Sequence, residues 1–165
     1  MKRAFAAAGV LAAALALTGT AATAGTDTTL GPHGYKGLQI GQNTTEAEAT
    51  GLLVDKQVQG DCTRYYLDPA EGKQHPGGGV WIDKNTGVVL ISGTDRTHTP
   101  EGITMGSTLD QVRKAYPALK PVPPQDFVYD TAVPDHPELR YRFAVDEHQR
   151  VTDYGLNTPS IGACG

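Results

Sequence analysis

The stretch that decides the fold occurs in two versions, GLQIGQNTTEA at residues 37–47 and GITMGSTLDQV at residues 102–112. The two versions align without a gap, and both glycines and both apolar positions between them match. Internal similarity of this kind is typical of a repeated structural unit. A repeat determines the predicted architecture, so it is considered before any single motif. Further matches occur downstream at a similar spacing.

Each version carries the pattern of a helix start. A capping residue is followed three positions later by Glu or Gln, the pairs being Asn43 with Glu46 and Thr108 with Gln111. In such a capping box, the cap side chain accepts a hydrogen bond from the third helical N–H, and the Glu or Gln side chain bonds back to the cap. The pattern predicts short helices at about 44–53 and 109–116.

Strand patterns recur downstream of both helices. The stretch VWIDKNTGV at 80–88 aligns with FAVDEHQRV at 143–151, and each has a polar turn between two apolar runs. Aromatic β-type runs at 63–67 and 126–129 lie between each helix and its hairpin. Short runs rich in aromatic and β-branched residues, bounded by turn residues, are typical of strands.

Each unit therefore reads as one helix followed by three strands. We predict an α+β fold of two tandem helix-plus-three-strand repeats, forming an antiparallel sheet with the helices on one face. Residues 25–97 would hold an N-terminal extension and the first α+β repeat, and residues 98–165 the second. The alternative is one irregular α+β domain in which the likeness is coincidental.

Residues 1–24 have the three parts of a secretory signal peptide. Lys2 and Arg3 form a positive start, residues 4–17 an uncharged apolar run, and Ala22-Thr23-Ala24 a small-residue end. The apolar run is shorter than the roughly 20 residues that a membrane span needs. We expect cleavage near Ala24, secretion, and no membrane span after cleavage; the alternative is an uncleaved membrane anchor.

The net charge argues against two classes of partner, and the cysteine content predicts a disulfide. The chain has 14 Lys and Arg against 18 Asp and Glu, a formal net charge of −4. This argues against nucleic-acid partners and against polybasic membrane binding, since both need an excess of Lys and Arg. The two cysteines, Cys62 and Cys164, predict a disulfide in an exported protein; two free buried thiols are the alternative.

Alternation along the predicted strands indicates which side chains leave the core. In residues 139–145 the odd positions are all apolar or aromatic, so Arg140 and Arg142 should point away from the helices. The same alignment turns Trp81, the only Trp of the chain, outward. Trp, Tyr and Arg are enriched among interface hot spots. The partner-binding candidates are Trp81, Arg140, Arg142, Tyr65 and Tyr66. The alternative is that Trp81 packs under a loop or on the Pro-rich segment 120–124.

No pattern of catalytic or metal-binding residues emerges. Only three serines follow the leader, and none lies in a G-x-S-x-G motif. The five histidines include no pair at helical spacing and no H-E-x-x-H motif. We therefore expect no catalytic residues, no metal site and no cofactor, and we expect that the protein is not an enzyme.

The two stretches at 37–47 and 102–112 share the pattern G-hydrophobic-x-hydrophobic-G-x-[S/T/N]-x-x-[E/Q]-[A/V], which resembles the start of the SmpA/OmlA-type small envelope domain of bacteria. A tandem of such units behind a signal peptide resembles the β-lactamase-inhibitory protein class. The resemblance implies a shared concave sheet, rich in aromatic residues, that clamps a partner enzyme. Two features depart from that class. A single bridge would join the two copies here, and Ala144 occupies the position equivalent to Trp81.

These observations lead to one functional hypothesis with two rivals. The leading hypothesis is a secreted, non-enzymatic module that binds another protein through the open face of its sheet and inhibits a secreted or envelope enzyme. One rival is a structural domain associated with the cell envelope. The other is a small secreted hydrolase whose site is built from loops.

Overall fold

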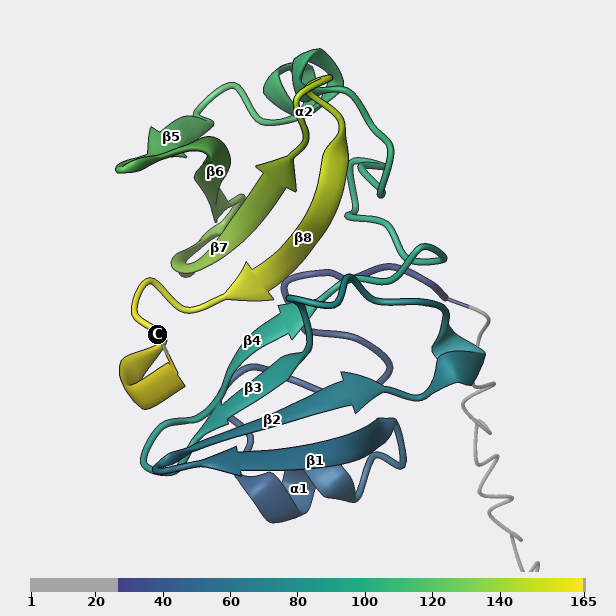
Figure 1. Cartoon of the computed structure of the whole chain (residues 1–165), viewed down its shortest axis with the longest axis vertical. Helices are drawn as coiled ribbons and strands as arrows, with labels where there is room; N and C mark the ends of the chain where they lie inside the picture. Colours follow the sequence, from purple (N-terminus) through teal and green to yellow (C-terminus); the bar gives the residue numbers. More distant parts are fainter. Residues whose placement is uncertain (1–26, 165) are drawn as a thin grey trace, which may run out of the picture.

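The computed structural model describes residues 27–164, which form an eight-stranded antiparallel sheet (Figure 1). The expected leader, residues 1–24, lies outside the described residues. The order of the strands in the sheet is β1-β2-β3-β4-β8-β7-β6-β5. No helix within the described residues is long and apolar enough to cross a membrane. The elements in chain order are α1 (Thr44–Glu48), β1 (Leu53–Gln59), β2 (Cys62–Leu67), the 3-10 turn η1 (Pro69–Glu71), β3 (Val80–Asp83), β4 (Gly87–Ser92), α2 (Leu109–Ala115), β5 (Lys120–Val122), β6 (Gln125–Val133), β7 (His136–Val145), β8 (Val151–Asn157) and the 3-10 turn η2 (Gly162–Cys164).

The predicted fold class is wrong. Instead of two α+β repeats of one helix and three strands, the structure is mostly one antiparallel sheet of eight strands. The helical segments α1 and α2 contain only five and seven residues. Both begin with the predicted capping boxes, at Asn43 and Thr108, so the local signals were correct. They indicated where the helices start, but not how little of the chain is helical.

The first helix is shorter than expected because the chain turns soon after it begins. Helix α1 ends at Glu48, and Gly51 adopts a positive φ of 71°, a conformation that glycine takes without steric cost. Strand β1 then begins at Leu53, where the expected helix would have ended. From Asp55 onward, β1 is exposed at the edge of the sheet and mostly polar, so it lacks the alternation that reveals a half-buried strand.

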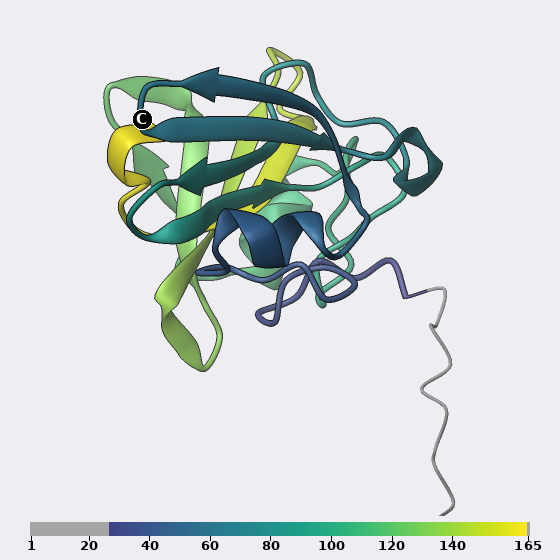
Figure 2. The same cartoon turned by 90° about the horizontal axis from the view of Figure 1, so that it is seen from below.

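The core lies on one face of the sheet. Helix α1 and the segment before it pack on that side, as the view from below shows (Figure 2). Leu30, Tyr35 and Leu38 of the N-terminal segment are each at most 1% exposed. The hydroxyl of Tyr141 donates a hydrogen bond of 2.9 Å to the carbonyl oxygen of Leu30, which fixes this segment against β7. The N-terminal segment is therefore part of the domain.

Strand alternation follows the prediction in β3 and β7. Val80 and Ile82 are buried in the core while Trp81 between them is half-buried on the opposite side. In β7 the buried residues are Leu139, Tyr141, Phe143 and Val145, and Arg140, Arg142 and Ala144 are half-buried between them. We call the face that carries Trp81 and Arg142, opposite the helices, the outer face.

Strands β4 and β8 join the two halves of the sheet. Leu90 pairs with Asn157, Ile91 with Leu156, and Ser92 with Gly155. A Cβ atom on Gly155 would lie 2.9 Å from the carbonyl oxygen of Ile91, so glycine permits this close approach of backbone to backbone. The outer face is consequently continuous across the join.

Candidate protein-binding face

One row of side chains crosses the centre of the outer face. Cross-strand pairing connects five residues in succession, one each from β2, β3, β4, β8 and β7. Residues directly opposite each other in an antiparallel ladder project from the same face. The row is Arg64, Trp81, Leu90, Asn157 and Arg140. It places Trp81 and Arg140, both partner-binding candidates, on one face but three strands apart, with Leu90 and Asn157 between them.

Three residues at one end of this row form what we call the aromatic cluster, namely Arg64, Tyr66 and Trp81. The guanidinium carbon of Arg64 lies 4.6 Å from the ring centroid of Tyr66 and 5.3 Å from that of Trp81. Arg64 also donates hydrogen bonds to the hydroxyl of Tyr66 and to the carbonyl oxygen of Pro76. The arginine therefore holds both rings, which pre-organises a flat, amphipathic surface.

The two adjacent tyrosine candidates lie on opposite faces of the sheet. Tyr66 lies on the outer face, and its hydroxyl donates a hydrogen bond of 2.9 Å to the carbonyl oxygen of Pro76. Tyr65 is buried in the core at 3% exposure, and its hydroxyl donates to Glu48 of α1. Successive residues of a strand point to opposite faces, so the two cannot both serve the outer face. Tyr65 is a packing residue in this structure.

The C-terminal segment, residues 158–164, covers one end of the outer face; we call it the strap. The predicted disulfide between Cys62 and Cys164 is confirmed, with a Cα–Cα distance of 5.1 Å.

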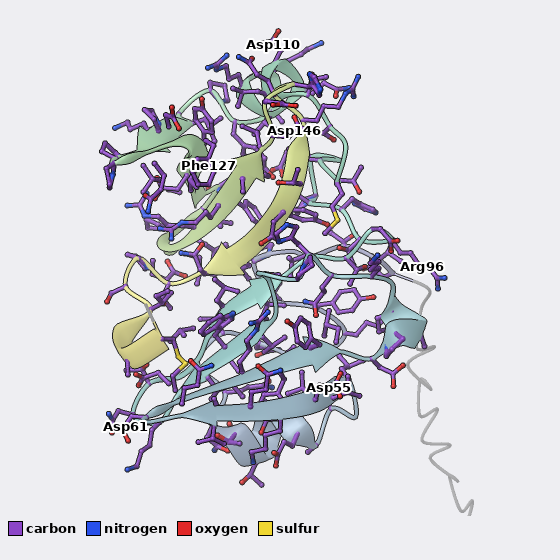
Figure 3. The ribbon with its side chains drawn as sticks, in the orientation of Figure 1. Asp55, Asp61, Arg96, Asp110, Phe127 and Asp146 are labelled. Atoms are coloured by element: carbon purple, nitrogen blue, oxygen red, sulfur yellow. A yellow bond between two sulfur atoms is a disulfide. The ribbon has the colours of Figure 1, made fainter. Side chains whose placement is uncertain are left out.

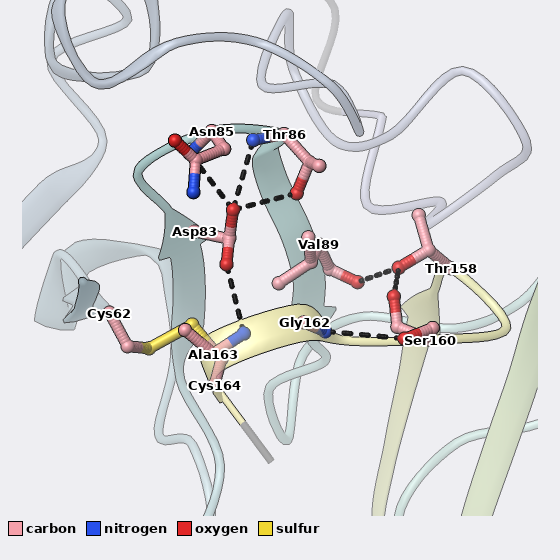
Figure 4. Close-up of a disulfide and its surroundings, with 10 residues drawn as sticks. All are labelled: Cys62, Asp83, Asn85, Thr86, Val89, Thr158, Ser160, Gly162, Ala163 and Cys164. Atoms are coloured by element: carbon pink, nitrogen blue, oxygen red, sulfur yellow. Dashed lines mark hydrogen bonds between the residues drawn. A yellow bond between two sulfur atoms is a disulfide. The ribbon is translucent and has the colours of Figure 1, made fainter.

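Figure 4 shows the strap held at both ends. The amide N–H of Thr158 donates 3.0 Å to the carbonyl oxygen of Val89, and that of Ala163 donates 2.9 Å to Asp83 Oδ2. Trp81 and Ile161 pack against the cluster around the disulfide, so the strap half-covers the indole.

Asp83 is the main polar attachment for the strap. Its Oδ2 accepts from Ala163, and its Oδ1 accepts from the backbone N–H groups of Asn85 and Thr86, at 2.9 and 3.0 Å. These backbone hydrogen bonds, the one from Ala163 first, lower the pKa of the Asp83 carboxyl to about 2. Hydrogen bonds to a carboxylate favour its ionised form. Asp83 consequently holds the strap as an anion over the neutral pH range.

At the other end of the row, the two arginine candidates lie on the second half of the sheet. Arg140 pairs in register with Asn157, and Arg142 pairs with Gly155 and with Asp130. The Arg142 Nη2 atom lies 4.0 Å from Asp130 Oδ2, a long ion pair between half-buried partners. The Nε atom of Arg142 is buried without a hydrogen-bond partner among the described residues.

Sequence reasoning missed a group of polar residues on β8. The side chains of Asp153 and Asn157 face the outer side, beside Ala144 and Leu90 respectively. Together with Arg142 they line a cavity of about 190 Å³ in the centre of the outer face. The remaining residues that line this cavity are Leu90, Ser92, Val128, Ala144, Tyr154 and Gly155. The alternation of β8, with Tyr154 and Leu156 buried, was the signal that would have found these residues.

The carboxyl group of Asp153 is chemically unusual for this face. Burial raises its pKa to about 6, against the smaller opposing effects of His75, a backbone hydrogen bond and Arg64. Desolvation disfavours the charged form of a carboxyl group. Asp153 therefore changes its protonation near pH 6, at the point of the outer face where the two halves of the sheet meet.

The outer face combines aromatic, arginine and other polar side chains. Within residues 27–164, no group of three or more His, Cys, Asp or Glu side chains is arranged to hold a metal ion. The aromatic and arginine side chains are held by their neighbours, and the cavity beside them is lined in part by Arg142, Asp153 and Asn157. Comparison of the chain with protein-family models, with curated proteins and with solved structures found no match.

Proposed function

We propose that this protein is a secreted, non-enzymatic binding module that holds another protein against the outer face of its sheet and thereby inhibits a secreted or envelope enzyme. The observation that carries the proposal is the row from Arg64 through Trp81 to Arg140, which neither α1 nor α2 covers; among residues 27–164, both α-helices lie on the other side of the sheet (Figure 2). Trp and Arg dominate interface hot spots because they desolvate a large area and bond at the same time. The resemblance to the β-lactamase-inhibitory protein class agrees with this use of the face.

The charge of the row supports a partner with an acidic contact surface. The row contains two arginines, Arg64 and Arg140, and no carboxylate, although the whole chain has a formal net charge of −4. Complementary charges accelerate association and align two proteins, and like charges oppose contact. An acidic surface on the partner would pair with the row and would be repelled by the rest of this chain.

Secretion is part of the proposal. The disulfide between Cys62 and Cys164 supports it, since disulfides persist in oxidising compartments. The leader-like residues 1–24 support it from the sequence. An exported binding module would meet its target enzyme outside the cytoplasm, where the disulfide that attaches the strap stays oxidised.

The test is a pull-down from culture fluid and envelope fractions, followed by affinity measurement on the purified complex. Trp81→Ala should weaken the complex by at least about 2 kcal/mol, because Trp is enriched among the residues that dominate the binding energy of interfaces. Phe127→Ala is the matched control. Phe127 is 51% exposed and lies on β6 (Figure 3). Its neighbour Val128 pairs with Ala144 on the outer face, so alternation directs Phe127 to the other face, and its removal should leave the affinity unchanged.

Two results would contradict the proposal. One is a purified complex whose affinity is the same for the Trp81→Ala and Phe127→Ala proteins. The other is sedimentation with isolated cell wall in the absence of any protein partner, which would favour a structural envelope domain. Enzyme assays on the captured partner, with and without this chain, would test inhibition directly.

A further inference from the structure

The cavity at the centre of the outer face, of about 190 Å³, has apolar walls. These walls include Leu90, Val128, Ala144 and Gly155, and the surface that the cavity exposes to solvent is mainly apolar. The four wall residues come from β4, β6, β7 and β8, so the cavity is built where the two halves of the sheet join. Apolar hollows that carry a few polar groups are typical of binding sites.

The apolar walls, and not the polar residues around them, decide what can enter the cavity. The atoms Arg142 Nε, Asp153 Oδ1 and Asn157 Oδ1 are buried from solvent, so an entering group meets mainly carbon atoms. A cavity of about 150 Å³ can hold benzene, so a volume of about 190 Å³ is sufficient for a leucine side chain. An aliphatic side chain is therefore the favoured occupant, because its entry removes apolar surface from water.

A positive charge lies at one end of the cavity. Arg140 stands beside Asn157 in the pairing of β7 with β8, and among residues 27–164 it forms no ion pair. Arg142, nearer the middle, lies 4.0 Å from Asp130. Asp153 marks the other end, about 13 Å from Asn157 along β8, because each residue of a strand advances about 3.3 Å. A carboxylate beside the aliphatic group would thus be attracted to the Arg140 end and avoid Asp153.

We propose that this cavity takes a leucine-sized aliphatic side chain of the bound protein, and that a carboxylate next to that side chain pairs with Arg140. That the occupant belongs to a protein rests on the proposed function; the recognition of an aliphatic group beside a carboxylate does not. The cavity adjoins the row at Leu90 and Asn157, so one partner can fill it and cover Trp81 at the same time. Side chains that fill pockets near the centre of an interface typically supply much of the binding energy.

The first test uses small probes, so that it needs no partner. The ¹⁵N-labelled protein is titrated with 4-methylpentanoate, with its neutral isostere 4-methylpentanamide and with acetate, and the backbone amide signals of Leu90 and Gly155 are followed by NMR. The midpoint for 4-methylpentanoate should lie at a concentration at least about tenfold below that for acetate, because only the former buries a branched aliphatic chain. Equal midpoints, or no saturable shift within the solubility of 4-methylpentanoate, would overturn the proposal.

Filling the cavity tests the assignment of this binding. Ala144→Leu enlarges a half-buried wall residue, so its added carbons take the space of the probe, and 4-methylpentanoate should bind at least about tenfold more weakly. Ala70→Leu is the matched control, since Ala70 lies on η1 and does not line the cavity. Native-like spectra establish that the variants fold, and Val128→Phe fills the cavity from β6 if Ala144→Leu does not fold. Undiminished binding to a folded variant with a filled cavity would overturn the assignment.

Arg140→Gln tests the carboxylate end of the cavity. It removes the positive charge and should weaken binding of 4-methylpentanoate by about twofold to fivefold, the range of a solvent-exposed ion pair, while 4-methylpentanamide binds as before. Arg113→Gln is the matched control, since Arg113 lies on α2 and does not line the cavity. An equal loss for both probes, or no loss for either, would overturn the pairing with Arg140.

The captured complex separates this inference from the proposed function. Ala144→Leu should weaken the complex at least about tenfold, and Ala70→Leu should leave it unchanged. A complex that depends on Trp81 but tolerates Ala144→Leu would overturn this inference and leave the proposed function standing. A complex that tolerates both Trp81→Ala and Ala144→Leu, formed by a chain that still binds 4-methylpentanoate, would overturn the proposed function and leave the recognition of an aliphatic carboxylate standing.

Discussion

The two halves of the sheet, β1–β4 and β5–β8, are alike on the side of the helices and different on the outer face (Figure 1). Each half follows a short helix with a capping box, and each buries an aromatic and aliphatic face in the common core. On the outer face, the first half has the aromatic cluster and the strap, and the second half has the ion pair between Arg142 and Asp130. On the helix side, both halves must pack into the common core, which constrains their side chains. The outer face is not constrained in this way, so its side chains can differ between the two halves.

The strap is the largest difference between the halves, and removing its covalent tie should have the largest effect. Replacing both Cys62 and Cys164 by Ser should lower the free energy of unfolding by about 4 kcal/mol, because the bridge closes a segment of 102 residues in the unfolded chain. Urea denaturation followed by circular dichroism measures this. Hydrogen exchange should rise in β2 and β3 more than in β6 and β7; an equal rise in both halves would contradict a strap that belongs to the first half.

The second difference concerns Asp153, whose pKa burial raises from the ordinary value of 3.8 to about 6 in the folded state. A carboxyl group with a raised folded-state pKa destabilises the fold when ionised, so its unfavourable contribution disappears as the pH falls from about 6 to about 4. Asp153→Asn should therefore be more stable than the parent by up to about 3 kcal/mol at neutral pH, with little difference at pH 4. Asp110→Asn serves as the control, and a pH-independent gain in Asp153→Asn would show that ionisation is not the cause.

The third prediction tests the likeness of the halves. Asn43→Ala and Thr108→Ala each remove a side-chain oxygen that accepts from the third helical N–H, at 3.0 and 3.2 Å. Each should cost about 1 kcal/mol of stability, which is typical for the loss of an N-cap. Thermal or urea unfolding of the two variants gives the comparison. A negligible loss of stability in one variant and a full loss in the other would show that the two helix starts contribute unequally to the stability of the fold.

Local signals in the sequence predicted the parts of the fold in which one side of an element is buried. The capping boxes marked both helix starts, and alternation in β7 assigned Tyr141 and Phe143, each 0% exposed, to the core. Strand β1 escaped prediction because it is a polar edge strand with little burial on either face. Strand β5 also escaped prediction, since a three-residue strand with Pro121 has almost no pattern of its own.

The same reasoning from the sequence predicted part of the candidate site. Alternation placed Trp81, Arg140 and Arg142 on the outer face. Which of Tyr65 and Tyr66 lies on that face could be decided only once the register of β2 was known. The cavity was not predictable, because it depends on the pairing of β4 with β8 across the centre of the sheet. That pairing joins residues 63 to 67 positions apart, and no local pattern encodes it.

The position of the single tryptophan makes the protein its own optical reporter. The chain contains one Trp, and its indole lies between the guanidinium of Arg64 and the cluster around the disulfide. Its fluorescence emission therefore comes from one site, which is the site where the strap, the aromatic cluster and a bound protein would meet. Opening of the strap should shift that emission to longer wavelength as water reaches the ring, and burial by a partner should shift it the other way, with no dye or label attached.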